Sequence, residues 1–184
     1  MKDQQITKNQ LPTGSESLWV KKCIRTFSGK YINVFDPSPD DIVIEDIAHA
    51  LSNQPRFGGH LPEFYSVCQH SIHCCDLASE ENQFTALMHD ASEAYLLDMP
   101  KPIKLEMTQY NRIEDKLMKV IAIKFGFKYP KPEEVDQIDY FMLEREWNVL
   151  MLREKSLKYY APIDIMSHEK AKEIFLEKFN YCKK

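Results

Sequence analysis

Long apolar runs, an excess of basic residues and paired cysteine motifs are all missing from this chain of 184 residues. No uncharged apolar stretch approaches the roughly 18 residues of a membrane span, and no charged-then-apolar signal segment begins the chain. We therefore expect no membrane partner. The net charge of −4 gives no basic stripe, so we expect no nucleic-acid polymer as a partner, although a small nucleotide is compatible with this charge.

The five cysteines are odd in number and irregularly spaced, and none of them forms a CxxC pair (positions 23, 68, 74, 75 and 182). Such a set favours reduced thiols, so we expect a cytoplasmic protein. No repeat, low-complexity tract or internal linker divides the sequence. We expect a flexible lead-in at residues 1–18, followed by a single domain at residues 19–184.

Turn residues and apolar spacing predict an all-α fold with one small N-terminal β-hairpin. Two β-prone runs within residues 24–35 flank Ser28-Gly29, which is a hairpin signal. Residues 97–103 contain Pro100 and Pro102 and are not expected to form regular helix. Apolar periodicity and capping residues predict helices over about 41–51, 66–78, 82–95, 107–125, 132–153 and 167–181.

The most informative stretch is residues 86–95, where His89, Asp90 and Glu93 fall within about 6 Å along a helix axis. A histidine beside a carboxylate costs free energy to bury unless something binds both. A divalent metal does so, because neutral imidazole and carboxylate oxygen are both good ligands. His89 and Asp90 are therefore candidate ligands, and Glu93, one turn further on, is a candidate general acid or base.

Further ligands must come from other helices. His70 lies 19 positions before His89 (89 − 70) on the preceding predicted helix, which could face it. Asp136 and Asp139 are alternatives on the helix after residue 132. We prefer Asp139, because Asp136 in the first turn is explained by the helix dipole. His70, His89, Asp90 and Asp139 would form a mixed nitrogen and oxygen site, suited to Zn²⁺, Mn²⁺, Co²⁺ or Fe²⁺ rather than Ca²⁺.

A different metal set also stays open. His70, His73 and Cys74 fall within roughly 100° of arc on one helix, which permits a structural zinc site that includes a cysteine. That set is one ligand short and has no CxxC spacing to support it. Cys74 and its neighbour Cys75 are more simply interpreted as small buried core residues.

The ligand order His70, His89-Asp90, Asp139 resembles that of the HD-domain phosphohydrolases, a family of helical metal-dependent enzymes. The resemblance spans about residues 27–152. Segments resembling the bacterial 5′-deoxynucleotidase branch are Arg56-Phe57, Gln69-His70-Ser71, residues 89–93, residues 98–104 and Asp139. Segments resembling phage enzymes that remove dATP from the nucleotide pool are residues 35–39, residues 44–51 and residues 64–67.

The resemblance implies a helical HD bundle that binds one divalent metal (zinc, manganese or cobalt, with magnesium as an option). It implies that Glu93 is the catalytic acid/base and that Arg56 and Lys104 lie near phosphate. It implies that Asp98 meets the deoxyribose 3′-hydroxyl and that Phe57 contacts the substrate. Phe57 is a departure, because the deoxynucleotidase branch typically has tryptophan after the arginine, at a position that bears on base selection.

The activity implied first is hydrolysis of dATP to deoxyadenosine and triphosphate in the cytoplasm of a bacterium or a phage-infected host. A 5′-deoxynucleotidase acting on deoxynucleoside monophosphates is the alternative, and a non-catalytic metal-binding regulatory module is a third. The resemblance also implies a homo-oligomer. Other interpretations of single residues stay open: Arg56 could pair with Glu63, Asp98 could form a turn, and Lys104 could be a solvated loop charge.

Overall fold

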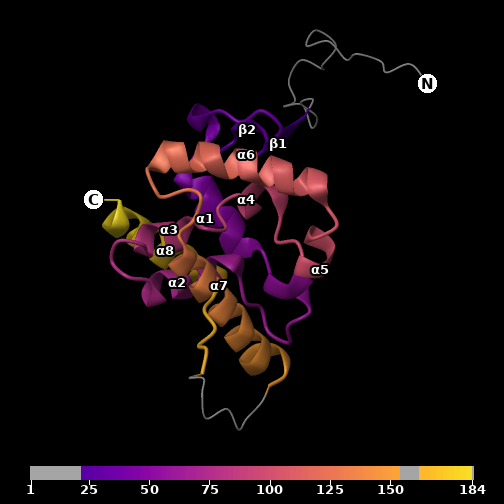
Figure 1. The fold of residues 1–184 in the computed structure, drawn as a ribbon, viewed down its shortest axis with the longest axis vertical. Helices are drawn as coiled ribbons and strands as arrows, with labels where there is room; N and C mark the ends of the chain where they lie inside the picture. The colour runs from indigo at the N-terminus through magenta and orange to yellow at the C-terminus, as the bar shows by residue number, and fades with distance from the viewer. Residues whose placement is uncertain (1–21, 154–161, 184) are drawn as a thin grey trace, which may run out of the picture.

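Helices dominate the computed structural model of the protein, which describes residues 22–153 and 162–183 (Figure 1). The expected lead-in at residues 1–18 lies outside these ranges. The elements are β1 (Cys23–Arg25), β2 (Tyr31–Asn33), η2 (Pro39–Asp41), α1 (Ile44–Asn53), η3 (Arg56–Gly59), α2 (Val67–Leu77), α3 (Gln83–Met88), α4 (Glu93–Leu96), α5 (Lys101–Lys104), α6 (Thr108–Phe125), α7 (Glu133–Glu146), η4 (Trp147–Met151) and α8 (His168–Cys182). Across both described ranges, no helix combines the length and apolar character that a membrane span requires.

The predicted hairpin is confirmed as an antiparallel pair of β1 and β2, in which Ile24 lies opposite Ile32. Gly29 in the turn has a φ of +87°, a left-handed conformation that glycine adopts without strain. Ser28 attaches the turn to α1, because its backbone N–H and its hydroxyl donate to the two carboxylate oxygens of Asp46 at 2.6 and 2.8 Å.

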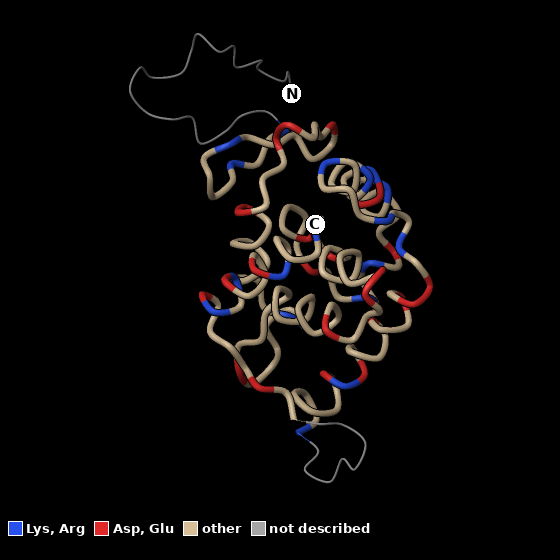
Figure 2. Tube along the Cα trace, turned by 90° about the vertical axis from the view of Figure 1, so that its left-hand side faces the viewer, with Lys and Arg blue, Asp and Glu red and all other residues tan. Residues whose placement is uncertain are grey.

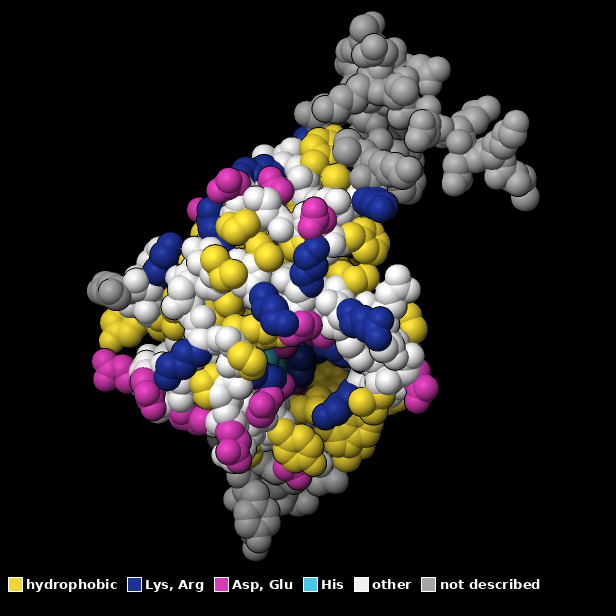
Figure 3. Space-filling view, turned by 45° about the horizontal axis from the view of Figure 1, so that its top comes forward, with side chains coloured by type: hydrophobic (Ala, Val, Ile, Leu, Met, Phe, Trp, Pro, Cys, Tyr) yellow, Lys and Arg dark blue, Asp and Glu magenta, His cyan; other side chains and the backbone are white. Residues whose placement is uncertain are grey.

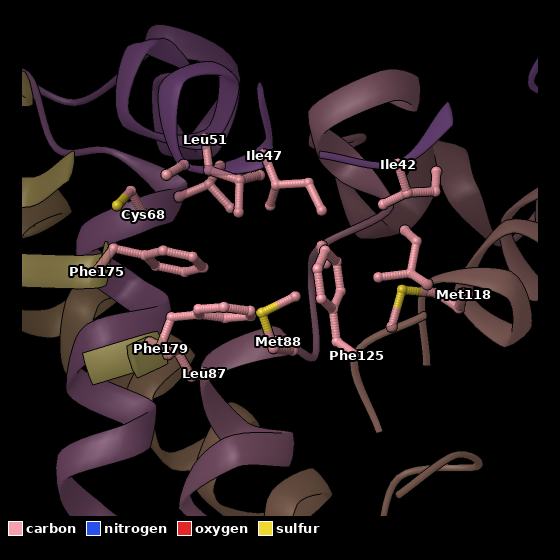
Figure 4. Close-up of a cluster of buried hydrophobic side chains, with 14 of the residues drawn as sticks. Ile42, Ile47, Leu51, Cys68, Leu87, Met88, Met118, Phe125, Phe175 and Phe179 are labelled. Atoms are coloured by element: carbon pink, nitrogen blue, oxygen red, sulfur yellow. The ribbon is translucent and has the colours of Figure 1, made fainter. Parts of the chain in front are cut away.

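The hydrophobic core lies where α1, α2, α3 and α8 pack together, with α2 contacting the other three helices. Helix α2 begins as predicted, because the Ser66 hydroxyl accepts the Gln69 N–H at 3.1 Å and caps its first turn. Phe179 of α8 makes edge-on ring contacts with Phe84 and Phe125, at centroid distances of 5.5 and 5.2 Å. Figure 4 shows Phe179 among the side chains of this core, which are Ile42, Ile47, Leu51, Cys68, Leu87, Met88, Met118, Phe125 and Phe175.

Two of the predicted helices differ in the structure. The helix predicted over residues 82–95 is divided into α3 and α4 by a tightened turn at residues 89–92, where Ala91 and Glu93 donate to carbonyls three residues back, each at 3.0 Å. The helix predicted over residues 132–153 ends its α-helical part at Glu146 and continues as the π-helix η4. Neither the turn at residues 89–92 nor the π-helix at residues 147–151 contains glycine or proline, so no helix-breaking residue in the sequence marks either change.

Basic and acidic residues are mixed along the described trace (Figure 2). For example, the ammonium group of Lys116 in α6 lies 2.7 Å from the carboxylate of Asp36. This ion pair connects α6 to the segment that follows β2.

Candidate metal centre

Two buried histidines from different helices face each other at the centre of the candidate site. His70 lies in the middle of α2, and His89 directly follows α3 in the tightened turn. Their side chains are fully buried, and their ring centroids are 5.2 Å apart. The packing of α2 against α3 therefore brings the two imidazoles together, as the sequence analysis expected.

The hydrogen bonds of the two imidazoles fix which nitrogen of each ring is available. His89 Nδ1 lies 2.7 Å from the carbonyl oxygen of Ala86, which can only accept, so Nδ1 must donate. His70 Nδ1 lies 2.7 Å from a carboxylate oxygen of Glu146 and donates to it. In the neutral rings, both Nε2 atoms then carry a free lone pair, which is the arrangement that metal-binding histidines adopt.

Two carboxylates complete a set of four converging donor atoms. Asp90 Oδ2 lies 3.2 Å from His89 Nε2 and 3.8 Å from His70 Nε2. Asp139 Oδ1 lies 3.2 Å from His70 Nε2 and 3.6 Å from His89 Nε2. Donors bound at about 2.0–2.2 Å to one metal ion are separated by about 3.0–3.6 Å, so these residues fit a metal ion.

The nitrogen His89 Nε2 supports the same fit. It is buried and makes no hydrogen bond to any described residue, although the Asp90 carboxylate lies beside it. A buried polar atom without a partner costs free energy. A cation between His89 and the carboxylates would satisfy this nitrogen.

The electrostatics of the cluster favour positive charge at this point. Burial by itself lowers the pKa of His89, yet Asp90 and Asp139 raise it to about 10. Burial raises the pKa of Asp139, but His70 and His89 hold it well below its usual range. Because the carboxylates stabilise any cation placed among them, a divalent metal suits this position.

A thiol also belongs to the cluster. His70, Cys74 and His89 form a buried group whose donor atoms all lie within 4.8 Å of one another, and this group could hold a metal ion. The zinc set considered from the sequence, with His73 in place of His89, is not assembled. His73 instead stacks against Tyr65, at a ring-centroid distance of 6.3 Å.

Of the two aspartates considered on α7, Asp139 reaches the histidines. Asp136 is largely exposed and pairs with Lys131 at 3.0 Å. Lys131 also contacts the outer oxygen of Asp139 at 3.1 Å, which leaves the inner oxygen directed at the histidines.

The cluster lies along a cleft of about 1460 Å³. Figure 3 shows a hollow with a histidine at its bottom, basic and acidic side chains at its mouth and apolar side chains along one wall. His70 is buried behind the residues that line the cleft and is not one of them. The other residues predicted for the site all line the cleft: Arg56, Phe57, His89, Asp90, Glu93, Asp98, Lys104 and Asp139.

Glu93 is buried beside the cluster, and no described residue hydrogen-bonds its Oε2. Burial raises its pKa well above the usual range, Asp90 and Asp98 raise it further, and Arg56 and Lys104 oppose them. Lys104 lies 3.9 Å from Glu93 Oε1 but binds Glu114 more closely, at 2.6 Å. The Glu93 carboxyl is therefore suited to hold a proton at the edge of the cleft.

Gln54 connects the backbones of Glu93 and Asp98, two of the acidic residues that line the cleft. Its side-chain amide donates to the backbone carbonyl of Glu93 at 2.8 Å, and its carbonyl oxygen accepts the Asp98 N–H at 3.1 Å. Burial raises the pKa of the Asp98 carboxyl, and the charge of Arg56 opposes that rise.

Glu146 is the buried residue that the sequence analysis missed. It accepts hydrogen bonds from His70, from the Tyr65 hydroxyl at 2.9 Å and from the Arg56 guanidinium at 2.9 and 3.2 Å. Arg56 is therefore in an ion pair, as one interpretation held, but with Glu146 instead of Glu63. Glu146 lies seven positions after Asp139 (146 − 139), and this spacing on one helix face was the signal that could have found it.

Two aromatic rings stand at the cleft beside the cluster. Phe57 has a φ of +54° and precedes two glycines that are also left-handed, Gly58 and Gly59. Its ring centroid lies 6.1 Å from that of Trp147, the first residue of the π-helix η4. Left-handed backbone at a phenylalanine is uncommon, and such strain is concentrated at functional sites.

The fold and site define a mostly helical protein with a small antiparallel sheet and a buried group that could hold a metal ion. No family model matches the chain. It is 47% identical over 123 residues to the Escherichia coli protein YfdR, covering 67% of this chain and 69% of that protein. It is 34% identical over 121 residues to a Rhodobacter capsulatus protein, covering 60% of this chain and 62% of that protein. The chain belongs to the family of YfdR, and both relatives are named as uncharacterized proteins.

Proposed function

We propose that the protein is an HD-type, metal-dependent phosphohydrolase of deoxynucleotides, acting first on dATP to give deoxyadenosine and triphosphate. The observation that carries this proposal is the convergence of His70, His89, Asp90 and Asp139 donor atoms along a cleft, with both Nδ1 atoms already engaged. The order of these ligands along the chain supports the HD assignment through the resemblance described above.

The bound metal would be zinc, manganese or cobalt, with magnesium as an option. It would lower the pKa of a bound water molecule and polarise a phosphoryl oxygen. His70, His89, Asp90 and Asp139 would hold it. Glu146 and the Ala86 carbonyl keep the two imidazoles in the binding tautomer and orientation.

Glu93 would move the proton. Its raised pKa favours a protonated carboxyl. From this position the acid could protonate the 5′-oxygen of the departing deoxynucleoside as the bond between that oxygen and the α-phosphorus breaks. Lys104, close to Glu93, would offset negative charge that builds up on the phosphate.

Arg56 would contact phosphate only through its Nη1 atom. Its Nε and Nη2 are bound to Glu146, whereas Nη1 lies 3.9 Å from Asp90 at the cleft wall. Buried charge pairs of this kind hold their geometry, so Arg56 would offer one fixed donor to an anionic oxygen.

The cleft is large enough for a deoxynucleoside triphosphate. Its volume of about 1460 Å³ exceeds the roughly 300–1000 Å³ of ordinary small-molecule pockets. Phe57 and Trp147 would provide apolar ring surfaces for a base, and Asp98 would accept a hydrogen bond from the deoxyribose 3′-hydroxyl.

One experiment separates the proposed activity from its alternatives. Protein loaded in turn with Zn²⁺, Mn²⁺, Co²⁺ and Mg²⁺ is incubated with deoxynucleoside triphosphates and monophosphates, and the released phosphorus species are resolved. Free triphosphate supports the proposal, and inorganic phosphate from monophosphates supports the 5′-deoxynucleotidase. Stoichiometric metal without turnover would indicate a regulatory module. The homo-oligomer implied by the resemblance stays a prediction, which light scattering tests.

A further inference from the structure

The thiol of Cys74 lies against the cluster and has no part in the reaction proposed above. Cys74 is fully buried, one turn after His70 in α2, and its Sγ lies 3.5 Å from His70 Nε2. We propose that Cys74 is a ligand of the same metal through its thiolate sulfur. This inference rests on the metal centre of the proposed function and adds to it the identity of the ion.

The separation of the two atoms fits a shared metal. With a nitrogen bond of about 2.05 Å, a sulfur bond of about 2.3 Å and an angle of about 110° between them at the metal, the two donor atoms are separated by about 3.6 Å. The observed separation between Sγ and Nε2 is 3.5 Å. The donor atoms of His89 and Cys74 also fall within the 4.8 Å limit of the group.

A simpler interpretation is a weak S–H hydrogen bond from Cys74 to His70 in a buried cysteine that only fills space. A metal held by the four residues proposed above would already satisfy His89 Nε2, so the case for the sulfur rests on its position. The donor atoms of His70, Cys74 and His89 all lie within 4.8 Å of one another, and the buried His89 Nε2 makes no hydrogen bond within the described ranges.

Cys74 lies on the buried side of the metal-binding cluster and not among the described residues that line the cleft. Cys74 packs in an apolar cluster with Ala78, Ala86, Val135 and Met142. The described residues that line the cleft include His89, Asp90 and Asp139 but not Cys74. A sulfur ligand at the back of the metal leaves the cleft side available for water and phosphate.

A thiolate ligand narrows the choice of metal. Soft sulfur favours Zn²⁺ and Co²⁺, whereas Mg²⁺ and Mn²⁺ prefer oxygen ligands. The thiol proton is released to solvent when the sulfur binds, so binding becomes weaker as the pH falls. Among the four metals named for the proposed function, which are zinc, manganese, cobalt and magnesium, a sulfur ligand therefore favours zinc and cobalt.

Cobalt absorption spectroscopy tests the assignment. Co²⁺ is added to the full chain after metal removal, and the visible and near-ultraviolet spectra are recorded for the wild type, Cys74→Ser and Cys75→Ser. Cys75 is the matched control, because it is the adjacent buried cysteine but packs in the main core cluster near Cys182. We expect an intense sulfur-to-cobalt charge-transfer band in the wild type and in Cys75→Ser. We expect Cys74→Ser to lose the band and to bind Co²⁺ at least about tenfold more weakly.

Each other outcome has a definite meaning. Visible cobalt bands without the charge-transfer band in the wild type would show that the metal binds without sulfur, which overturns this inference and leaves the proposed function intact. Failure of the wild type to bind stoichiometric Co²⁺ or Zn²⁺ overturns both. If Cys74→Ser does not fold, Cys74→Ala takes its place, and a band that survives in the folded variant overturns the inference.

Discussion

Glu146 offers the sharpest test of how the candidate site is held together. It is fully buried and accepts hydrogen bonds from His70, Tyr65 and Arg56. The substitution Glu146→Gln keeps the size of the side chain but removes its charge. The amide cannot replace a carboxylate that accepts from three donors, so Arg56 loses its ion pair within the protein interior.

The structure gives the size of the expected effect. Burial raises the pKa of Glu146, but His70 and Arg56 outweigh it and lower the pKa to about 2. The difference from an unfolded glutamate, near pH 4.3, corresponds to about 3 kcal/mol. This stabilisation is fully present above the unfolded pKa and is lost as the pH falls towards the folded value. At neutral pH, we therefore expect Glu146→Gln to lower the free energy of unfolding by about 3 kcal/mol.

Urea unfolding of the metal-free protein at neutral pH measures this loss of stability, and metal competition measures an expected loss of metal affinity. Because Glu146 orients His70, its substitution should weaken metal binding by about 10- to 100-fold. The matched control is Glu144→Gln, two residues away on the same helix and exposed, which should change stability by less than about 0.5 kcal/mol. If Glu146→Gln were as stable as this control and bound metal equally well, the account of Glu146 would be wrong.

Four further substitutions test the other parts of the site. Asp139→Ala should lose metal and activity together, whereas Asp136→Ala should keep both; metal analysis that shows the reverse would identify Asp136 as the ligand. Glu93→Gln should keep its metal but turn over at least about 100-fold more slowly, and near-normal turnover would remove Glu93 from the mechanism. Trp147→Ala should raise KM for the nucleotide more than it lowers kcat, and an unchanged KM would show that the Trp147 ring does not contact the base.

The parts of the site that follow from local helix geometry could be predicted from the sequence. The Ser66 cap and the apolar periodicity of α2 placed His70 correctly within a helix. The preference for Asp139 over Asp136 also followed from position alone, because a carboxylate in a first turn is already stabilised by the helix dipole. The structure brings Asp139 to the histidines and leaves Asp136 exposed.

The parts that depend on contacts between helices could not be predicted in the same way. The angular spacing of residues on an α-helix grouped His70 with His73 and Cys74, because all three lie on one helix. Which of them meets His89 depends on how α2 packs on α3, and the structure brings Cys74 to His89 but turns His73 towards Tyr65. The tightened turn at residues 89–92 could not be predicted because it contains neither glycine nor proline, the residues that usually mark the end of a helix.

Helix α7 contacts several parts of the candidate site at once. Asp139 of α7 contacts Nε2 of His70, and Glu146 of the same helix binds Nδ1 of that ring. One rigid helix therefore contacts both nitrogens of the same imidazole and also fixes Arg56 through Glu146. A shift of α7 relative to α2 would disturb a candidate ligand, its orienting group and the buried arginine together. A substitution that weakens the packing of α7 against α2 should therefore also weaken metal binding.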